Sequence, residues 1–190
     1  VPLRTSFRNA YAYDNVLYLA AGEVIQAVSG KSWEEFVTER ILNRIGMIGS
    51  VLRQDDFARS PDRAAAHAPI DGVVREVKAF ETDNMSPAGG ISSSAADMAK
   101  WVQVLLGGGR LPDGALLFSE RTARELTALV TPIPIGNPPA ELGALRRNFN
   151  GYALGLNVHD YRGRKVVTHT GGLSGFVSKV TMLPEVGLGV

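Results

Sequence analysis

The sequence of 190 residues contains no cysteine, which excludes disulfide bonds, thiolate metal sites and cysteine nucleophiles. Lys and Arg total 20 against 19 Asp and Glu, so the net charge of +1 gives no electrostatic reason to expect nucleic acid or an anionic membrane as a partner. No segment approaches the roughly 18 consecutive apolar residues typical of a membrane span. The first residues also lack the pattern of a signal peptide.

What the sequence does contain is typical of a globular protein. Hydrophobic residues make up 45% and charged residues 21% of the 190 positions. A chain of this length forms one domain or a large part of one, and it can bury roughly 70% of its unfolded surface. Composition therefore predicts a folded domain with a substantial core.

Helical signals dominate the first two-thirds. The spacing of apolar residues predicts a helix over 16–28 that ends at Gly30, and Ser32 with Glu35 forms a capping box for a second helix that ends near Gly46. Further helices are expected over 95–106, after Ser93 or Ser94, and from Ser119 to about residue 130. Residues 50–92 and 132–150 are predicted to be mostly loop, with one hairpin at Asp71-Gly72.

From residue 151 onward the pattern changes to strands. We expect strands over 152–158, 165–169 and 176–183 and another from Leu188, with Ser174 in a turn. Such short connections favour antiparallel hairpins. The predicted fold class is therefore α+β, with a mainly helical region over 1–150 followed by an antiparallel sheet over 151–190.

The first candidate for chemistry is Tyr13-Asp14-Asn15, directly before the first helix. A tyrosine whose pKa is lowered by a cation can act as a general base, and an asparagine can orient a lysine or a substrate amide. The structural alternative is an ordinary helix start, with Asn15 as the N-cap and Tyr13 in packing. The short pattern alone favours that alternative.

The second candidate is His169-Thr170-Gly171-Gly172, at the end of a predicted strand. Paired glycines allow a substrate to approach the backbone and leave an N–H group as an oxyanion donor, while His169 can supply a proton or a charge. The alternative is a bulge or turn with a histidine facing solvent. Taken alone, this motif also favours the structural alternative.

Together the two motifs resemble those of the beta-lactamase-related serine hydrolases, which include class C beta-lactamases, penicillin-binding D,D-peptidases and esterases. Tyr13 and Asn15 match Tyr-x-Asn, and His169 and Gly171 match the third motif in its His-x-Gly form. Other segments are similar to the family in the same order, namely YDNVLYLAAGEVIQAVSG, SWEEFVTERILNRIGM, PAGGISSSAADMAKWVQVLL and HTGGLSGFVSKVTMLPE. The resemblance implies a partial beta-lactamase/transpeptidase-like fold.

The resemblance also implies roles for these residues. Tyr13, Asn15, His169 and Gly172 would be catalytic, and Thr170 and Gly171 would contact a small-molecule or peptide acyl substrate. No metal and no organic cofactor is expected. A periplasmic or secreted location is plausible from the family, although the sequence itself leaves the location open.

The family's nucleophile motif, Ser-x-x-Lys, is absent, because no serine is followed by lysine three residues later. We therefore expect the chain to be a fragment, with the nucleophile and a last strand and helix supplied by other residues, and to be inactive alone. Strands without their neighbours predict self-association or pairing with the missing segment. Three functions remain open: an esterase or peptidase, a true beta-lactamase, whose usual third-motif lysine is replaced by His169, and a non-catalytic binding module.

Overall fold

The computed structural model describes residues 5–190, which form two compact units. The first unit comprises residues 5–13, 102–169 and 179–190, and the second comprises residues 14–101 and 170–178. Among residues 5–190, no helix is long and apolar enough to cross a membrane.

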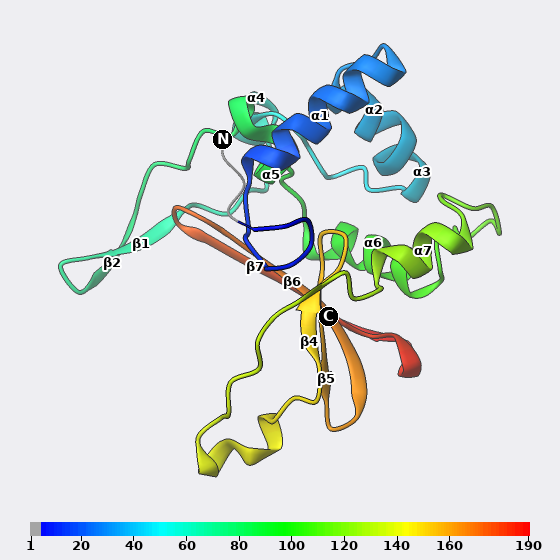
Figure 1. Ribbon diagram of the computed structural model, residues 1–190. Coiled ribbons are helices and arrows are strands. Elements are labelled where there is room, and N and C mark those ends of the chain that lie inside the picture. The colour runs from blue at the N-terminus through cyan, green and yellow to red at the C-terminus, as the bar shows by residue number, and fades with distance from the viewer. Residues whose placement is uncertain (1–4) are drawn as a thin grey trace. The chain divides into compact units, whose positions relative to one another are not determined.

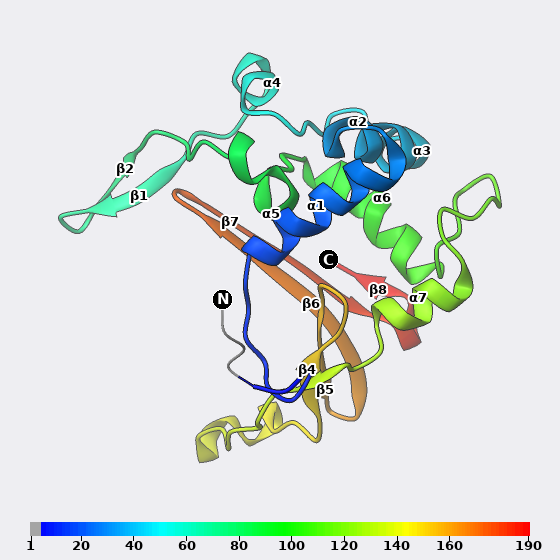
Figure 2. The same cartoon turned by 45° about the horizontal axis from the view of Figure 1, so that its top comes forward.

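The second unit contains most of the helices (Figures 1 and 2). They are α1 (Val16–Ser29), α2 (Trp33–Val37), the π-helical η1 (Thr38–Leu42), α3 (Asn43–Ile45), α4 (Gln54–Arg59), the 3-10 helix η2 (Asp83–Met85), α5 (Ser86–Gly89) and the first part of α6 (Ala95–Leu106). The predicted second helix is continuous up to Gly46, but its middle widens into the π-helical segment. Its buried apolar residues are Val37, Leu42 and Ile45.

Local chemistry explains where these helices begin. The predicted capping box is present, because the Ser32 hydroxyl accepts from the Glu35 N–H and the Glu35 carboxylate accepts from the Ser32 N–H. Helix α1 is capped instead by Asp14, whose carboxylate accepts a hydrogen bond of 2.8 Å from the Val16 N–H. Gly22 allows α1 to approach α5, since a Cβ at this glycine would lie 2.5 Å from Cγ of Pro87.

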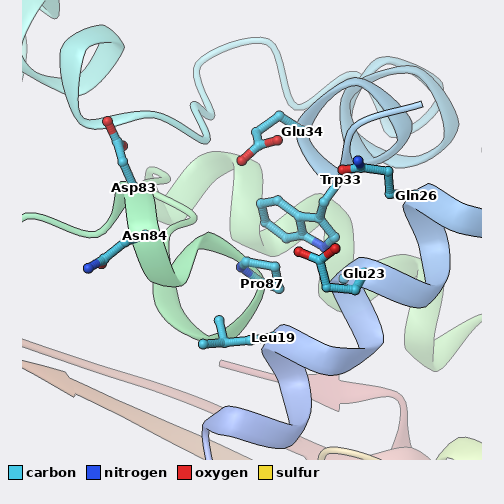
Figure 3. Close-up of a pocket in the computed structure, with 9 residues that line it drawn as sticks. Leu19, Glu23, Gln26, Trp33, Glu34, Asp83, Asn84 and Pro87 are labelled. Carbon is cyan, nitrogen blue, oxygen red and sulfur yellow. The ribbon is translucent and has the colours of Figure 1, made fainter. Parts of the chain in front are cut away.

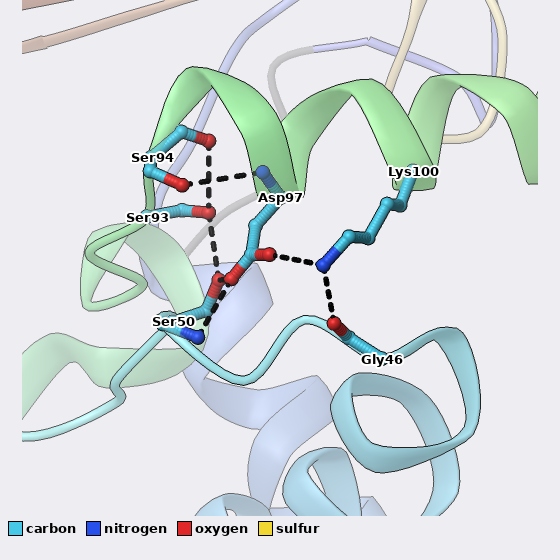
Figure 4. Close-up of polar contacts among 7 residues, drawn as sticks. Gly46, Ser50, Ser93, Ser94, Asp97 and Lys100 are labelled. Carbon is cyan, nitrogen blue, oxygen red and sulfur yellow. Dashed lines mark hydrogen bonds and ion pairs between the residues drawn. The ribbon is translucent and has the colours of Figure 1, made fainter.

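A buried carboxylate joins the start of α6 to the turn after α3 (Figure 4). Asp97 is 4% exposed, and its Oδ2 accepts hydrogen bonds from the Gly49 N–H at 2.9 Å and the Ser50 hydroxyl at 3.0 Å. Its Oδ1 pairs with Lys100 at 2.7 Å. The hydrogen bond from Lys100, with those from Ser50 and Gly49, outweighs burial and lowers the pKa of Asp97.

The sheet has six antiparallel strands in the order β3-β4-β5-β6-β7-β8. They are β3 (Thr131–Pro132), β4 (Asn150–Tyr152), β5 (Asn157–Tyr161), β6 (Arg164–Leu173), β7 (Phe176–Leu183) and β8 (Leu188–Gly189). The first unit also holds α7 (Glu120–Leu126) and the 3-10 helices η3 (Ala140–Leu145) and η4 (Pro184–Val186). The predicted α+β class is confirmed.

The core of the first unit lies between the end of α6 and the sheet. Val102 packs with Val167 of β6 and Met182 of β7, which are 0% and 1% exposed. Half-buried apolar residues surround them, namely Leu105, Leu106, Leu156 and Val180. The helix spacing predicted from sequence thus places its C-terminal half against two central strands.

A separate hairpin, β1 (His67–Ile70) with β2 (Val73–Glu76), occurs where the sequence predicted one. Asp71 and Gly72 form its turn with φ angles of 51° and 78°. This left-handed backbone suits an Asp-Gly pair and matches the twist of the two strands.

Three sequence predictions were wrong. Residues 152–158 are not one strand, because Gly155 adopts φ 84° and the Ala153 N–H bonds to the Leu156 carbonyl at 2.7 Å, which makes a turn between β4 and β5. The helix from Ser119 stops at Leu126, since Val130 donates instead to the Tyr152 carbonyl at the start of β3. The strand predicted over 165–169 is too short, because β6 runs from Arg164 to Leu173 and includes the motif at 169–172 near its end.

Candidate active site

The structure brings two predicted site residues together in the first unit. Tyr13 ends the segment before α1, and His169 lies within β6. Their ring centroids are 6.2 Å apart with an interplanar angle of 43°. Tyr13 is 47% exposed and His169 is half-buried, so both rings can reach a group that arrives from solvent.

Two further tyrosines, which the sequence reasoning did not select, complete an aromatic cluster. The Tyr152 ring lies 6.3 Å from the Tyr13 ring and 6.4 Å from the His169 ring. Tyr11 contacts the Tyr152 ring at 5.1 Å. In the sequence, Tyr152 looked like an ordinary strand residue, and only its position two residues before Leu154-Gly155 hinted at a turn.

The other predicted residues belong to the second unit. Asn15 precedes α1, and its carbonyl accepts the first helical hydrogen bonds, from Tyr18 at 3.1 Å and Leu19 at 3.4 Å. The side chain that caps the helix belongs to Asp14. The structural alternative for Asn15 therefore holds for its backbone, while the capping side chain comes from its neighbour.

Thr170, Gly171 and Gly172 are exposed residues of β6. The two glycines differ in their surroundings. A Cβ at Gly171 would lie 2.5 Å from Oγ of Ser178, whereas among residues 5–190 a Cβ at Gly172 would meet no atom within 4 Å other than those of its chain neighbours. Packing within the described chain thus explains a glycine at 171 but not at 172.

A buried carboxylate holds the segment that leads into β4. Asp160 is 2% exposed, and its Oδ1 accepts from the N–H groups of Asn148 at 2.5 Å and Phe149 at 3.1 Å. Its Oδ2 accepts from the Asn148 side-chain amide at 2.6 Å. Burial favours the neutral acid, but these N–H groups, together with that of Gly163, outweigh it and hold the pKa of Asp160 below its ordinary value.

The pKa of the neighbouring His159 is also lowered, which for a histidine favours the neutral form. Burial, followed by the charge of Arg147, lowers its pKa, and the opposing effect of Asp160 is smaller. His159 therefore tends to be neutral in the folded protein.

A cavity of about 300 Å³ lies in the second unit (Figure 3). Its lining includes Glu23 of α1, the Trp33 indole and Glu34 of α2, and Asp83 with Pro87. None of the predicted site residues lines it. The cavity is therefore separate from the residues for which the sequence predicts chemistry.

Comparison with known families identifies the class of protein. The family described as Beta-lactamase matches residues 1–190. The chain therefore belongs to the Beta-lactamase family, whose relatives include hydrolases, and the predicted family resemblance is confirmed.

Individual relatives are similar over nearly the whole chain. It is 28% identical to the unguisins hydrolase ungD of Aspergillus violaceofuscus, an alignment that covers 100% of this chain and 35% of the fungal protein. The octameric penicillin-binding protein homologue from Pyrococcus abyssi has the same fold with a TM-score of 0.78 and 22% identity, over 95% of this chain and 37% of the archaeal one. A D-stereospecific amidohydrolase from Streptomyces sp. matches with a TM-score of 0.70 and 22% identity, over 95% and 48% of the two chains. The chain thus spans about a third to a half of these relatives.

Proposed function

We propose that this chain supplies the general base, the third motif and one oxyanion donor of a serine hydrolase active site. Its substrate is an ester or amide, and the reaction proceeds through an acyl-enzyme. The observation that carries the proposal is the contact between the rings of Tyr13 and His169, whose centroids lie 6.2 Å apart. The two residues come from opposite ends of a sequence that belongs to the Beta-lactamase family.

The nucleophile in this proposal is the serine of a Ser-x-x-Lys segment outside the 190 residues. Its Oγ attacks the acyl carbon, and the proton passes to Tyr13, assisted by the lysine of that segment. The developing oxyanion is held by the serine's own N–H and that of Gly172. The bond to the leaving group then breaks as that group takes up the proton, and water hydrolyses the acyl-enzyme.

The remaining motif residues have supporting roles in this mechanism. Asn15 orients the lysine or a substrate amide through its side-chain donor and acceptor. His169 provides a proton or a charge near the substrate's carboxylate or leaving group. Thr170 and Gly171 contact the substrate along the exposed part of β6.

The surroundings of Gly172 leave room for the proposed oxyanion role. A Cβ at Gly172 would meet no atom of the described chain other than those of its neighbours, so the backbone there is open to a group that arrives from outside these residues. An acyl substrate whose carbonyl oxygen reaches the Gly172 N–H is such a group.

One protein of the same fold is named a D-stereospecific amidohydrolase, and the unguisins hydrolase is named as a hydrolase, so amide hydrolysis is the first reaction to test. A peptide or amino-acid amide is therefore the first substrate class to test. A panel with a D-amino-acid amide, a chromogenic ester and a chromogenic cephalosporin separates peptidase or esterase activity from beta-lactamase activity.

The test of the base is Tyr13→Phe in a longer protein that includes the Ser-x-x-Lys segment. Loss of a general base lowers the rate by about 10² or more, so kcat should fall by that factor while the protein remains folded. Tyr161→Phe is the matched control, because Tyr161 is a tyrosine of similar exposure, 39%, at the end of β5. Equal activity of the Tyr13→Phe variant and the control would remove Tyr13 from the mechanism.

A further inference from the structure

The ring of Tyr152 is in contact with both residues of the proposed catalytic pair. Tyr13, His169 and Tyr152 form a triangle whose ring centroids are 6.2, 6.3 and 6.4 Å apart. Tyr11 packs on the same ring at 5.1 Å with an interplanar angle of 48°. Tyr152 thus contacts the other three rings of the cluster.

The backbone of Tyr152 is fixed by its neighbours in the sheet. Its carbonyl accepts a hydrogen bond of 2.9 Å from the Val130 N–H, and it pairs in register with Asn157 of β5. Asn157 pairs in turn with Thr168, the residue before His169. The sheet therefore places Tyr152 level with Thr168, directly before His169 in β6.

Both ends of the short strand β4 are also held. Before it, the carboxylate of Asp160 binds the N–H groups of Asn148 and Phe149. After it, the hydrogen bond from Ala153 to Leu156 closes the turn to β5. Tyr152 consequently projects from a restrained segment, whereas Tyr13 is itself 47% exposed and lies outside any helix or strand.

We propose that Tyr152 is a positioning residue for the reaction, an inference that rests on the function proposed above. Its ring restricts the orientations of the Tyr13 phenol and the His169 imidazole, so that both are placed before a substrate binds. A catalytic group must be held close to its productive geometry, because a misplacement of about 1 Å can lower the rate by about 10². The contacts through the ring, rather than the chemistry of the hydroxyl, carry this role.

The first experiment needs no catalytic activity. The chain has three histidines, so the ring-proton NMR signal of His169 can be assigned with a His169→Gln variant. Tyr152→Leu should shift the His169 signal, because it removes an aromatic ring 6.4 Å away, and it should leave the signal of His67 on β1 unchanged. Tyr152→Phe should keep the parent signal, and Tyr161→Leu serves as a control for loss of another tyrosine.

The second experiment measures catalysis in the longer protein with the Ser-x-x-Lys segment. Tyr152→Leu should lower kcat by about 10- to 100-fold with little change in KM, and Tyr152→Phe should restore it. The acid limb of the kcat profile, which reports on the proposed general base, should also move, because the surroundings of the Tyr13 ring change. A variant that is merely less stable would keep the parent kcat per folded molecule and the parent pH profile.

Several results would overturn the inference. They are an unchanged His169 signal in Tyr152→Leu, an unchanged kcat in the same variant, or a Phe variant as slow as the Leu variant. If Tyr152→Leu does not fold, an NOE between the Tyr152 and His169 rings in the parent chain takes its place, and absence of that NOE rejects the contact. Failure of the proposed function shows differently, as no turnover by the longer parent protein while the NMR contacts remain.

Discussion

Removal of the Asp160 carboxylate should destabilise the first unit strongly, although no cation pairs with it among the contacts described for residues 5–190. Three N–H groups, from Asn148 and Phe149, donate to this residue, which is 2% exposed. Hydrogen bonds to a charged group contribute about 1.5–3 kcal/mol each. Because Asn148 and Phe149 are exposed, water can replace part of the hydrogen bonding that their N–H groups lose. We therefore expect Asp160→Ala to lower the free energy of unfolding by about 3–4 kcal/mol.

Asp160→Asn separates the charge from the shape. The amide keeps one carbonyl oxygen for the two backbone N–H groups, but its NH₂ faces the side-chain amide of Asn148. We expect a loss of about 1–2 kcal/mol for this variant. At about 2–4 °C per kcal/mol for a chain of this size, the melting temperature should fall by about 2–8 °C for Asn and about 6–16 °C for Ala.

The pH dependence has a definite sign. The pKa of Asp160 is lowered in the folded state, so its contribution is complete above the ordinary carboxyl pKa of 3.8 and is lost as the pH falls through the folded value. His159 also loses its contribution on acidification, because its folded pKa is lowered too, but that loss begins below its ordinary value of 6.5. Comparison of Asp160→Asn with the parent chain isolates the contribution of Asp160, because His159 is present in both proteins.

The assay is urea unfolding followed by circular dichroism, at pH 7 and at steps from pH 5 to pH 3. Asp160→Asn should flatten the acid limb relative to the parent chain. Asp62→Ala is the control, since Asp62 is an exposed carboxylate. The reasoning is refuted if Asp160→Ala unfolds within 1 kcal/mol of the parent, a threshold below a single charged hydrogen bond, or if the acid limb of Asp160→Asn is unchanged.

Three further predictions concern other parts of the chain. Gly172→Ala should leave the melting temperature unchanged, because a Cβ there has open space, yet lower kcat/KM of the longer protein if substrate approaches that backbone; equal activity would count against the oxyanion role. Asp97→Ala should lower the free energy of unfolding in urea by about 3 kcal/mol, the lower end for a broken buried ion pair, because Lys100 is 40% exposed. A loss under about 1 kcal/mol would contradict the buried network. The chain should self-associate at high concentration, because β8 is an edge strand of the sheet, with Leu188 52% exposed and the adjacent Val190 83% exposed. A monodisperse monomer in light scattering would contradict the predicted self-association.

The sequence predicted the helices well because their signals are local. The capping box at Ser32, the spacing of Val102 with Leu105 and the Asp71-Gly72 turn each depend on residues a few positions apart. Such signals act within one or two turns of chain and survive folding when the tertiary structure agrees with them.

The errors arose where the sheet decides the local structure. Residues 152–158 have the apolar composition of a strand, but Gly155 takes a left-handed backbone and converts the middle of the run into a turn. The end of the helix from Ser119 is lost because Val130 bonds to a strand that follows 22 residues later, at Tyr152. No local pattern contains either partner.

Local motifs selected only some of the residues that meet at the candidate site. Motif spacing identified Tyr13 and His169, and the structure places their rings in contact. Tyr152 was not selected because its ring contacts are with residues far away in the sequence, at positions 11, 13 and 169. A motif shows which residues have suitable chemistry, while the packing around them requires the fold.

The central claim is that this chain completes an acyl-transfer site whose nucleophile lies elsewhere. Burst kinetics with a chromogenic ester test it most directly, on the 190-residue chain and on a longer protein that carries the Ser-x-x-Lys segment. The account predicts a burst equal to the enzyme concentration for the longer protein, abolished by replacement of the motif serine, and no burst for the 190 residues alone. Turnover or stable acylation of the isolated chain would contradict it.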